Sequence, residues 1–433
     1  MSFKTHYEAI RWLESQTKFR PKTDLSIMQH AIKLLDLDLS KIQKVHVAGT
    51  NGKGSVSHYV KNILKRKGFK VGLFTSPYVY IFNERFMIND DMISHQELLD
   101  LTNFIQIFNL KMLEVYQESL SFFELLTVMS FKYFYDQKVD YMVIEVGIGG
   151  LLDATNVLNY DLSLITSIGF DHMKQLGNTL ESIALNKLGI LKKGNRLIST
   201  VRNDLYPLFQ SYCDNLGVPF TYVDVDKDVL QHHMFPFDQR VSYEFGTFVL
   251  GMPGYEQSAN ALLALYAGKA LFPNDPYSSM SEAISETKLP GRFEPFMPDP
   301  KIVLDGAHNE HAMKNLSQTI KAYHIGHRTH VIFSALGDKD IPLMLDILKP
   351  AVKSITLTAF DDPRYQSLLP YQTPDIGFEP DMIKLIRDLR KNHSSDYVIV
   401  TGSIHFIGTF KKALIRDKSK SGGTFVEKNK QSS

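Results

Sequence analysis

The chain has 433 residues, of which 44% are hydrophobic and 22% charged, and its formal net charge is +1. This composition is typical of a globular protein with two domains, and the balanced charge gives no reason to expect nucleic acid or a membrane surface as a partner. The single cysteine, Cys213, excludes an intrachain disulfide framework and a cysteine-based metal cluster. The amino-terminal segment carries charges throughout, and no apolar run is long enough to span a bilayer, so we expect a cytoplasmic protein.

A glycine-rich turn follows the first well-defined strand pattern of the chain. Residues 45–55 read VHVAGTNGKGS, a β-branched run that ends in glycines and one lysine, Lys53. Glycines let the backbone turn tightly and direct its N–H groups at phosphate oxygens. Lys53 adds a cation, and Ser55 adds a hydroxyl for Mg²⁺. The segment therefore predicts a nucleotide phosphate site rather than an ordinary loop, although Gly54 separates the lysine from the hydroxyl residue.

The segments on either side of this turn predict a βαβ unit. Apolar residues recur at helical spacing over 56–64, and basic residues followed by Gly68 end that helix. The run KVGLFTSP at 70–77 indicates a buried strand that ends in a polar turn. The loop then lies at the amino terminus of a helix, where anions bind.

The rest of the chain predicts two α/β domains. Strand patterns alternate with amphipathic segments at 44–48, 70–75, 140–146, 162–168 and 196–201, which indicates a mostly parallel sheet covered by helices. Short alternating strands at 218–250 (FTYVDV, VSYEF and TFVLG) indicate a small antiparallel addition. The proline-rich segment at 289–300 precedes a second, smaller α/β unit with strand patterns at 301–305, 330–336, 354–360 and 396–403. We predict domains over 1–295 and 296–416, and a flexible tail over 417–433.

Polar residues stand at strand ends in the first predicted domain, where open α/β sheets bind ligands. Ser76 follows one strand, and Glu145 ends an apolar strand that runs into glycines. A carboxylate there suits Mg²⁺, held directly or through water, although a salt bridge to a neighbouring helix would also satisfy it. His172 follows Asp171 at the end of the next strand. Its ring is a poor Mg²⁺ ligand, so chemistry alone favours a structural or hydrogen-bonding histidine.

The second half of the chain holds further candidates. Asp305 ends a strand, and His308 stands at the start of a helix that either it or Asn309 could simply cap. Arg292, in the proline-rich segment, could reach a phosphate or pair across the two domains.

Twelve segments occur in a characteristic order along nearly the whole chain. They are GTNGKGS (49–55), LFTSP (73–77), FNERF (82–86), SFFELLT (121–127), EVGIGGLLDATN (145–156), SIGFDH (167–172), LGNTLESIALNKLGI (176–190), QSANALLAL (257–265), LPGRFE (289–294), LDGAHN (304–309), ALGDKD (335–340) and GSIHFIG (402–408). This set resembles the folylpolyglutamate synthase family, which includes the dihydrofolate synthases and belongs to the Mur ligase superfamily.

The resemblance implies an ATP- and Mg²⁺-dependent ligase that adds L-glutamate to the γ-carboxylate of (tetrahydro)folate through an acyl phosphate. It leaves open whether dihydropteroate is also an acceptor. It further implies a P-loop-type domain with the folate site, a smaller Rossmann-like domain, and a monomer whose partners are ATP, folate and L-glutamate. A muropeptide ligase is the alternative, although such ligases usually carry a threonine after the lysine of this loop. A non-catalytic nucleotide-binding module is a third hypothesis.

The resemblance also assigns roles to residues on the nucleotide side. Lys53 is both a phosphate ligand and a catalytic residue, and two domains close on one nucleotide. His172 becomes a metal ligand rather than a structural histidine. The phosphate loop is Thr50, Asn51, Gly52, Lys53, Gly54 and Ser55; the ATP contacts are Asn260, Arg292 and Asp305; the Mg²⁺ positions are Ser55, Ser76, Glu145 and His172.

Other implied roles concern the second metal and the substrates. Lys187 matches a lysine that is carbamylated in the family and helps to hold a second Mg²⁺. His308 would place the incoming glutamate. Phe122, Phe123, Glu124 and Asp153 lie in segments that resemble the folate site, although phenylalanines are by themselves more often core residues. The chain departs from the usual family pattern at Tyr78, Leu151, Leu188 and Glu256, which leaves the preferred folate open.

Overall fold

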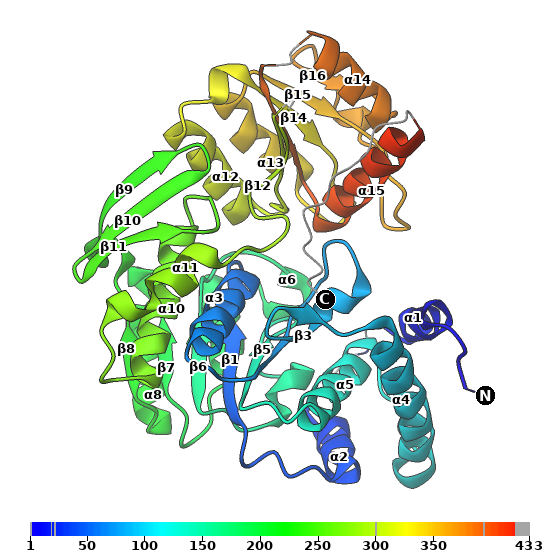
Figure 1. The fold of residues 1–433 in the computed structure, drawn as a ribbon, viewed down its shortest axis with the longest axis vertical. Helices are drawn as coiled ribbons and strands as arrows, with labels where there is room; N and C mark the ends of the chain where they lie inside the picture. The colour runs from blue at the N-terminus through cyan, green and yellow to red at the C-terminus, as the bar shows by residue number, and fades with distance from the viewer. Residues whose placement is uncertain (1, 19, 21–22, 299–300, 393–394, 421–433) are drawn as a thin grey trace. The chain divides into compact units, whose positions relative to one another are not determined.

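The computed structural model describes residues 2–18, 20, 23–298, 301–392 and 395–420 (Figure 1). The chain divides into two compact units, which we call unit 1 (1–233, 238–252 and 256–289) and unit 2 (234–237, 253–255 and 290–433). The predicted boundary after residue 295 falls within strand β12 (Glu294–Pro298) of unit 2. The predicted tail from 417 begins within helix α15 (Ile404–Lys420), and from 421 onward it lies outside the described residues.

Unit 1 is built on an eight-stranded sheet with the order β4-β3-β2-β5-β1-β6-β7-β8. The six strands from β2 to β8 in this order pair in parallel, and β3 and β4 form an antiparallel edge. This confirms the predicted mostly parallel sheet. The strands are β1 (Gln43–Ala48), β2 (Val71–Phe74), β3 (Phe86–Ile88), β4 (Asp91–Met92), β5 (Tyr141–Glu145), β6 (Leu162–Ile165), β7 (Leu197–Ser199) and β8 (Phe220–Tyr222).

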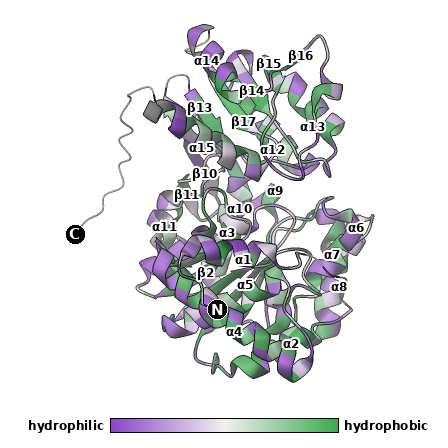
Figure 2. Cartoon of the chain, turned by 90° about the vertical axis from the view of Figure 1, so that its right-hand side faces the viewer, coloured by the Kyte–Doolittle hydropathy of each residue, from purple (hydrophilic) through white to green (hydrophobic). Residues whose placement is uncertain are grey.

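Helices cover both faces of this sheet because its strands are apolar on both sides. Along β5, Met142 and Ile144 join one hydrophobic cluster while Tyr141 and Val143 join another, since successive side chains of a strand point to opposite faces. The hydropathy colouring shows the same arrangement, with hydrophobic strands inside and hydrophilic helix surfaces outside (Figure 2). The helices of unit 1 are α1 (His6–Ser15), α2 (Ser26–Leu35), α3 (Lys53–Arg66), α4 (His95–Tyr116), α5 (Phe122–Asp136), α6 (Met173–Leu176), α7 (Leu180–Leu188), α8 (Tyr206–Leu216), α9 (Val225–Asp228), α10 (Gln257–Leu271) and α11 (Ser281–Glu286).

A three-stranded sheet forms the predicted antiparallel addition. Its order is β11-β10-β9, with β9 (Val229–Phe235), β10 (Asp238–Tyr243) and β11 (Gly246–Leu250). One detail of the prediction is wrong, because the segment FTYVDV does not belong to this sheet. Its residues Phe220–Tyr222 form β8, which pairs in parallel with β7 in the main sheet. A half-exposed edge strand alternates in polarity whichever sheet it joins, so its pattern does not identify its partner.

Unit 2 contains a six-stranded sheet with the order β12-β13-β17-β14-β15-β16, in which only the β12 edge is antiparallel. This confirms a second α/β unit. Its remaining strands are β13 (Lys301–Leu304), β14 (Thr329–Phe333), β15 (Ser354–Leu357), β16 (Ile376–Phe378) and β17 (Tyr397–Thr401), and its helices are α12 (Glu310–Ala322), α13 (Ile341–Leu348), α14 (Met382–Asn392) and α15.

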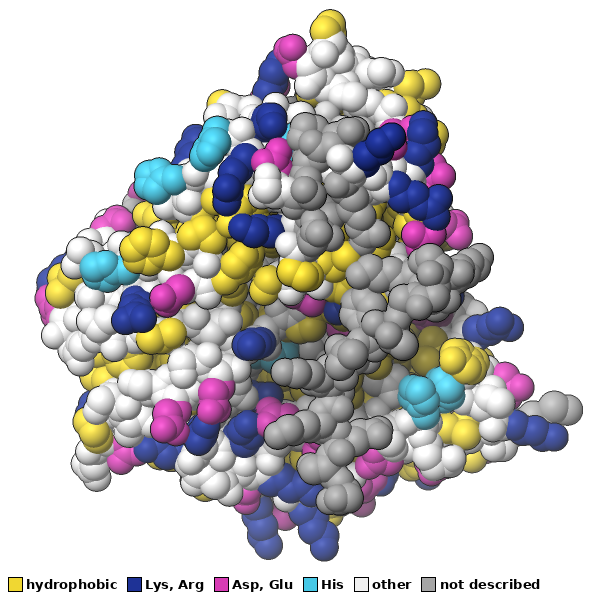
Figure 3. Space-filling model, turned by 45° about the horizontal axis from the view of Figure 1, so that its top comes forward, with side chains coloured by type: hydrophobic (Ala, Val, Ile, Leu, Met, Phe, Trp, Pro, Cys, Tyr) yellow, Lys and Arg dark blue, Asp and Glu magenta, His cyan; other side chains and the backbone are white. Residues whose placement is uncertain are grey.

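The surface of the chain matches its balanced composition. Basic and acidic side chains are interspersed over the face drawn in Figure 3. Within the described residues, no helix combines the length and the apolarity that a membrane span requires.

Candidate active site

The predicted phosphate loop, residues 49–55, connects β1 to the first turn of α3. Gly49 and Gly52 have φ angles of +147° and +86°, a region that side chains other than glycine rarely adopt. A Cβ atom built at Gly49 would lie 1.8 Å from Thr166 Oγ1, and one built at Gly52 would lie 2.3 Å from Asn260 Oδ1. Both positions therefore require glycine, and the predicted ATP contact Asn260 lies directly against the loop.

Hydrogen bonds from the end of β6 hold this loop in shape. The Thr50 N–H donates to Ser167 O over 2.7 Å, and the Asn51 N–H donates to Ser167 Oγ over 3.0 Å. The Thr166 hydroxyl donates to Asn51 O over 2.5 Å. These bonds fix the backbone of the loop, and a fixed backbone lowers the entropic cost of binding an anion.

Two lysines meet at one carbonyl of the loop. Lys53 Nζ donates to Gly49 O over 3.1 Å and to Thr50 O over 3.2 Å. Lys187 Nζ, from α7, donates to the same Gly49 oxygen over 2.9 Å, and this lysine is only 3% exposed. Burial, with a smaller contribution from the nearby Lys53, lowers the pKa of Lys187 to about 7. This lowered pKa favours the neutral amine of Lys187.

Oxygen groups gather at the start of α3. A Cβ built at Gly54 would lie 3.8 Å from both carboxylate oxygens of Glu145. Glu145 Oε2 accepts the Ser76 N–H over 3.0 Å, and the buried Ser55 hydroxyl accepts from Gln257 Nε2 over 3.4 Å. Carboxylate and hydroxyl oxygens are the ligands that Mg²⁺ prefers, so Glu145 and Ser55 fit the predicted metal, and Ser76 adjoins Glu145 through its backbone N–H. Within the described residues, no group of three or more His, Cys, Asp and Glu side chains could hold a metal, so such a site needs other ligands as well.

His172 stands immediately before α6 with a φ angle of +51°. Its Nε2 lies 4.0 Å from Asp171 Oδ1, and its backbone N–H donates to the same oxygen over 2.9 Å. The side chain is 39% exposed. Both the metal role and the hydrogen-bonding role of this histidine stay predictions.

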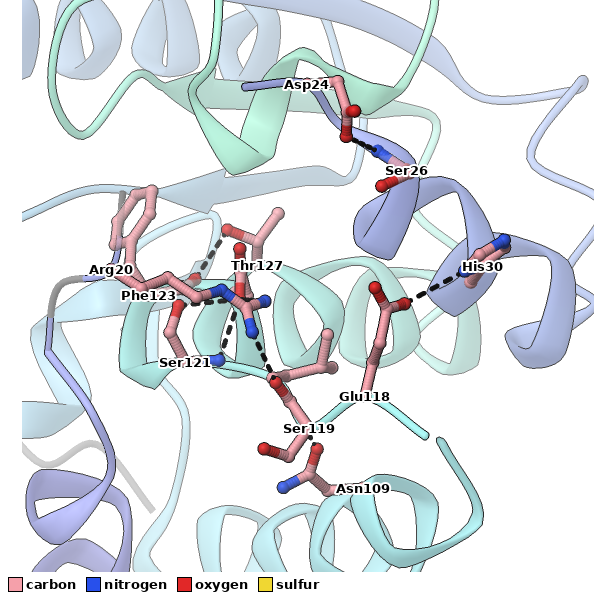
Figure 4. Close-up of polar contacts among 12 residues, drawn as sticks. Arg20, Asp24, Ser26, His30, Asn109, Glu118, Ser119, Ser121, Phe123 and Thr127 are labelled. Atoms are coloured by element: carbon pink, nitrogen blue, oxygen red, sulfur yellow. Dashed lines mark hydrogen bonds and ion pairs between the residues drawn. The ribbon is translucent and has the colours of Figure 1, made fainter. Parts of the chain in front are cut away.

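The buried carboxylate of Glu124 belongs to the first turn of α5. Figure 4 shows two of its neighbours, Arg20 and Ser121. Glu124 accepts the Ser121 N–H over 2.8 Å and the Ser121 hydroxyl over 2.7 Å, which completes a capping box. Arg20 Nη2 donates to the same oxygen over 2.7 Å. Phe122 N also donates to Thr17 O over 2.9 Å, so the amino-terminal loop is fastened to α5 beside the predicted folate residues.

Asp153 caps the short 3₁₀ helix η2 (Ala154–Val157), and Phe123 lies in the first turn of α5. Asp153 accepts the Thr155 N–H over 3.0 Å and the Thr155 hydroxyl over 2.6 Å, and its other oxygen accepts the Ile148 N–H over 3.0 Å. A Cβ built at Gly147 would lie 2.5 Å from the Phe123 ring. Phe123 therefore packs onto the glycine-rich turn that precedes Asp153.

In unit 2, Asp305 is a buried carboxylate at the end of β13. It accepts the Phe293 N–H and the Ala307 N–H, each over 2.9 Å. Burial raises the pKa of Asp305. Arg292 Nη1 donates to Gly291 O over 3.1 Å, so both predicted ATP contacts of this unit are anchored to its backbone.

The sequence left open whether His308 or Asn309 caps the helix that follows them. Asn309 caps α12, because its side chain accepts the Ala312 N–H over 2.9 Å. His308 instead donates Nδ1–H to Gly306 O over 2.8 Å. The capping alternative is thus confirmed for Asn309, and the glutamate role of His308 stays a prediction.

Sequence reasoning missed Arg85. This arginine lies in the short 3₁₀ helix η1 (Phe82–Arg85) and is 7% exposed. Its place within the segment FNERF, next to Phe86, was the available signal.

Family models place the chain among known proteins. The Mur ligase middle domain matches residues 47–268, and the Mur ligase glutamate ligase domain matches residues 291–404. Together with the phosphate loop and the two α/β units, these matches define the chain as a Mur ligase.

Individual relatives narrow this class. The dihydrofolate synthase/folylpolyglutamate synthase of Bacillus subtilis (strain 168) is 32% identical over 430 residues, which cover 95% of this chain and 100% of that protein. The folylpolyglutamate synthase of Lacticaseibacillus casei is 30% identical over 399 residues, covering 87% and 90%. A solved FPGS-AMPPCP-folate complex is 26% identical with a TM-score of 0.82, covering 95% of this chain and 100% of that one. The chain belongs to the folylpolyglutamate synthase/dihydrofolate synthase family.

Proposed function

We propose that the chain is an ATP-dependent ligase that adds L-glutamate both to the γ-carboxylate of tetrahydrofolate and to dihydropteroate. The observation that carries this proposal is the phosphate loop with Glu145 and Lys187 beside it, in a chain that matches the whole length of the bifunctional Bacillus subtilis enzyme. Several other relatives, including that of Escherichia coli (strain K12), carry the same double name. No comparison favours a muropeptide ligase over this reading.

The proposed reaction has two steps. A carboxylate oxygen of the acceptor attacks the γ-phosphorus of ATP, and the bond from that phosphorus to the bridging oxygen of ADP breaks. The amine of glutamate then attacks the acyl carbon, the bond to phosphate breaks, and the amine loses a proton. The backbone N–H groups of the loop and the Lys53 ammonium bind and neutralise the phosphates, so the protein acts mainly by positioning and by electrostatic stabilisation.

The proposal includes Mg²⁺ at Ser55, Ser76, Glu145 and His172, where the oxygens of Ser55 and Glu145 fit the ion. When bound, Mg²⁺ would neutralise charge on the phosphates. Asn260, Arg292 and Asp305 remain the proposed ATP contacts, and Phe122, Phe123, Glu124 and Asp153 the proposed folate side.

Carbamylation of Lys187 is part of the same proposal. The neutral amine attacks the carbon of CO₂ and a proton leaves, which converts a buried cation into a carbamate anion suited to a second Mg²⁺. The lowered pKa of Lys187 supports this step, because only the neutral amine is nucleophilic.

The test is ADP release with ATP, Mg²⁺ and L-glutamate, comparing tetrahydrofolate with dihydropteroate as acceptor. We expect turnover with both. Turnover with tetrahydrofolate alone would restrict the enzyme to polyglutamate synthesis. Turnover with neither acceptor, but with a muramyl substrate, would overturn the proposal. Location in the cytoplasm and a monomeric state stay predictions from the sequence.

A further inference from the structure

Arg85 is a buried guanidinium without a carboxylate partner. Arg85, the last residue of η1, is 7% exposed, and its Nε has no hydrogen-bond partner among the described residues. Within the same part of the chain its side chain forms no ion pair, although the charges of Glu14, Glu145 and Glu84 favour the cation from farther away. A buried and unpaired charge is unfavourable for the fold, so its presence requires another explanation.

Three aromatic rings enclose this guanidinium. Its Cζ lies 5.1 Å from the centre of the Tyr78 ring, 5.4 Å from that of Phe82 and 5.6 Å from that of Phe122. Aromatic faces attract a cation but accept little from its in-plane N–H groups. We call the rings of Tyr78, Phe82 and Phe122 the aromatic box. It stabilises the charge of Arg85 and leaves the in-plane N–H groups of the guanidinium available to an anion.

The carboxylate next in sequence is already engaged. Glu84 accepts the backbone N–H groups of Val79, Tyr80 and Ile81 over 2.7, 2.9 and 2.9 Å. These bonds fold the loop before η1 around Glu84. The glutamate thereby orders the loop that follows Tyr78, and although its charge favours the Arg85 cation, it forms no ion pair with it.

Arg85 lies between the proposed metal residues and the proposed folate residues of unit 1. The Thr75 N–H donates to Arg85 O over 3.2 Å, and the next N–H, that of Ser76, donates to Glu145 Oε2 over 3.0 Å. On another side, the aromatic box includes Phe122. An anion bound to Arg85 would thus touch the folate side and lie near Glu145.

We propose that Arg85 binds the acceptor carboxylate of the pterin substrate, the group that is phosphorylated by ATP. This inference rests on the proposed function and assigns one residue to its reacting group. A guanidinium binds a carboxylate with two parallel N–H···O bonds, which fixes the plane of the carboxylate. The aromatic walls keep water away from this pair, so the carboxylate is both oriented and desolvated.

The test compares two ligands on matched variants. One ligand is dihydropteroate, and the other is its analogue without the benzoate carboxylate. The proteins are the wild type, Arg85→Met, Arg85→Lys and the control Arg66→Met, which removes an exposed arginine paired with Glu282 and Glu286. The dissociation constant of each ligand is measured by titration calorimetry, together with that of AMPPCP.

We expect the wild type and Arg66→Met to bind dihydropteroate about 10- to 100-fold more tightly than the analogue. Arg85→Met should abolish this preference and leave the affinity for AMPPCP unchanged, and Arg85→Lys should retain part of it. Because Arg85→Met removes an unpaired buried charge, its urea unfolding midpoint should equal or exceed that of the wild type.

Two results would overturn the inference. If Arg85→Met kept the preference, the arginine would not bind the carboxylate. If Arg85→Met instead lowered the affinity for AMPPCP, Arg85 would bind the nucleotide. A wild type that turns over dihydropteroate while either result holds would leave the proposed function intact, whereas a wild type that neither binds nor turns over any pterin would overturn both.

Discussion

At the scale of single residues, buried cations in unit 1 differ in how their charge is compensated. Lys61 is 3% exposed and pairs with Asp90 over 2.9 Å. Lys187 is equally buried but donates to the Gly49 carbonyl rather than to a carboxylate within the described residues, and Arg85 faces aromatic rings. Burial lowers the pKa of Arg85 to about 10 and, together with Lys53, that of Lys187 to about 7. Burial and neighbouring charges also shift pKa values in active sites, so both groups are candidates for functional roles.

A first prediction concerns Lys187. With ¹³C-labelled bicarbonate, the protein should show a carbamate signal in ¹³C NMR that is absent from Lys187→Met and present in the control Lys193→Met. Ligase turnover should fall at least tenfold after removal of CO₂ and recover with bicarbonate. Since the neutral amine is required, the signal should weaken as the pH falls through about 7. Full activity of Lys187→Met would contradict the proposal.

His46 is a buried base whose neutral form is built into the fold. Its Nε2–H donates to Thr155 Oγ1 over 2.8 Å, the Thr155 hydroxyl donates to Asp153 over 2.6 Å, and its ring stacks on Tyr160. Burial, with a smaller contribution from Lys192, lowers the pKa of His46 to about 3. Because this value lies below the ordinary 6.5, the stability that it contributes is present above pH 6.5 and is lost as the pH falls toward 3.

A second prediction follows from this histidine. Between pH 7 and pH 5, the free energy of unfolding of the wild type should fall by about 2 kcal/mol more than that of His46→Asn, which cannot titrate. Urea unfolding of unit 1 can be followed by the fluorescence of the only tryptophan, Trp12, in α1. Parallel pH dependences of the two proteins would show that His46 is not held neutral.

At the scale of elements, the phosphate loop depends on the surfaces that enclose it. Gly52 and Gly68 both have positive φ angles, of +86° and +89°. A Cβ at Gly52 would strike Asn260 of α10, whereas a Cβ at Gly68 meets nothing within 4 Å. The two glycines therefore share the same backbone strain but differ in their contacts.

A third prediction uses this matched pair. Gly52→Ala should weaken AMPPCP binding at least tenfold, because the loop must move away from Asn260 to accept the methyl group. Gly68→Ala should lose about 1 kcal/mol of stability from the backbone alone and keep its affinity for the nucleotide. Calorimetric titration of both variants decides the point, and equal affinities would mean that the loop adapts without cost.

At the scale of the whole molecule, the two units can be followed separately. AMPPCP at 100 times its Kd should stabilise the unit that binds it by about 2.7 kcal/mol. Hydrogen exchange in peptides from 49–66 should slow accordingly, and not in Gly52→Ala. Slower exchange at 291–305 would support ATP contacts by Arg292 and Asp305, and unchanged exchange there would remove both residues from the proposed site.

Much of the fold was predictable because its signals are local. The parallel strands of both units, the loop at the start of α3 and the antiparallel addition each follow from residue patterns within a few positions. The partner of β8 was not predictable, since a short strand with mixed exposure carries no mark of the sheet that it joins. The same holds for the candidate site. Its phosphate loop was predictable from the sequence, whereas the aromatic box around Arg85 was not.

The sequence by itself determined the class of chemistry. Glycines that permit positive φ angles, a lysine and a hydroxyl residue specify a phosphate loop over a few adjacent positions, because backbone geometry is a local property. Only the tertiary structure decided which distant groups meet there. Lys187 reaches the carbonyl of Gly49 from 138 residues away, and Phe122 closes a box on Arg85. Burial and electrostatic coupling depend on every element packed around a group. The lowered pKa of Lys187 and the lack of an ion pair at Arg85 among the described residues are therefore properties of the folded chain alone.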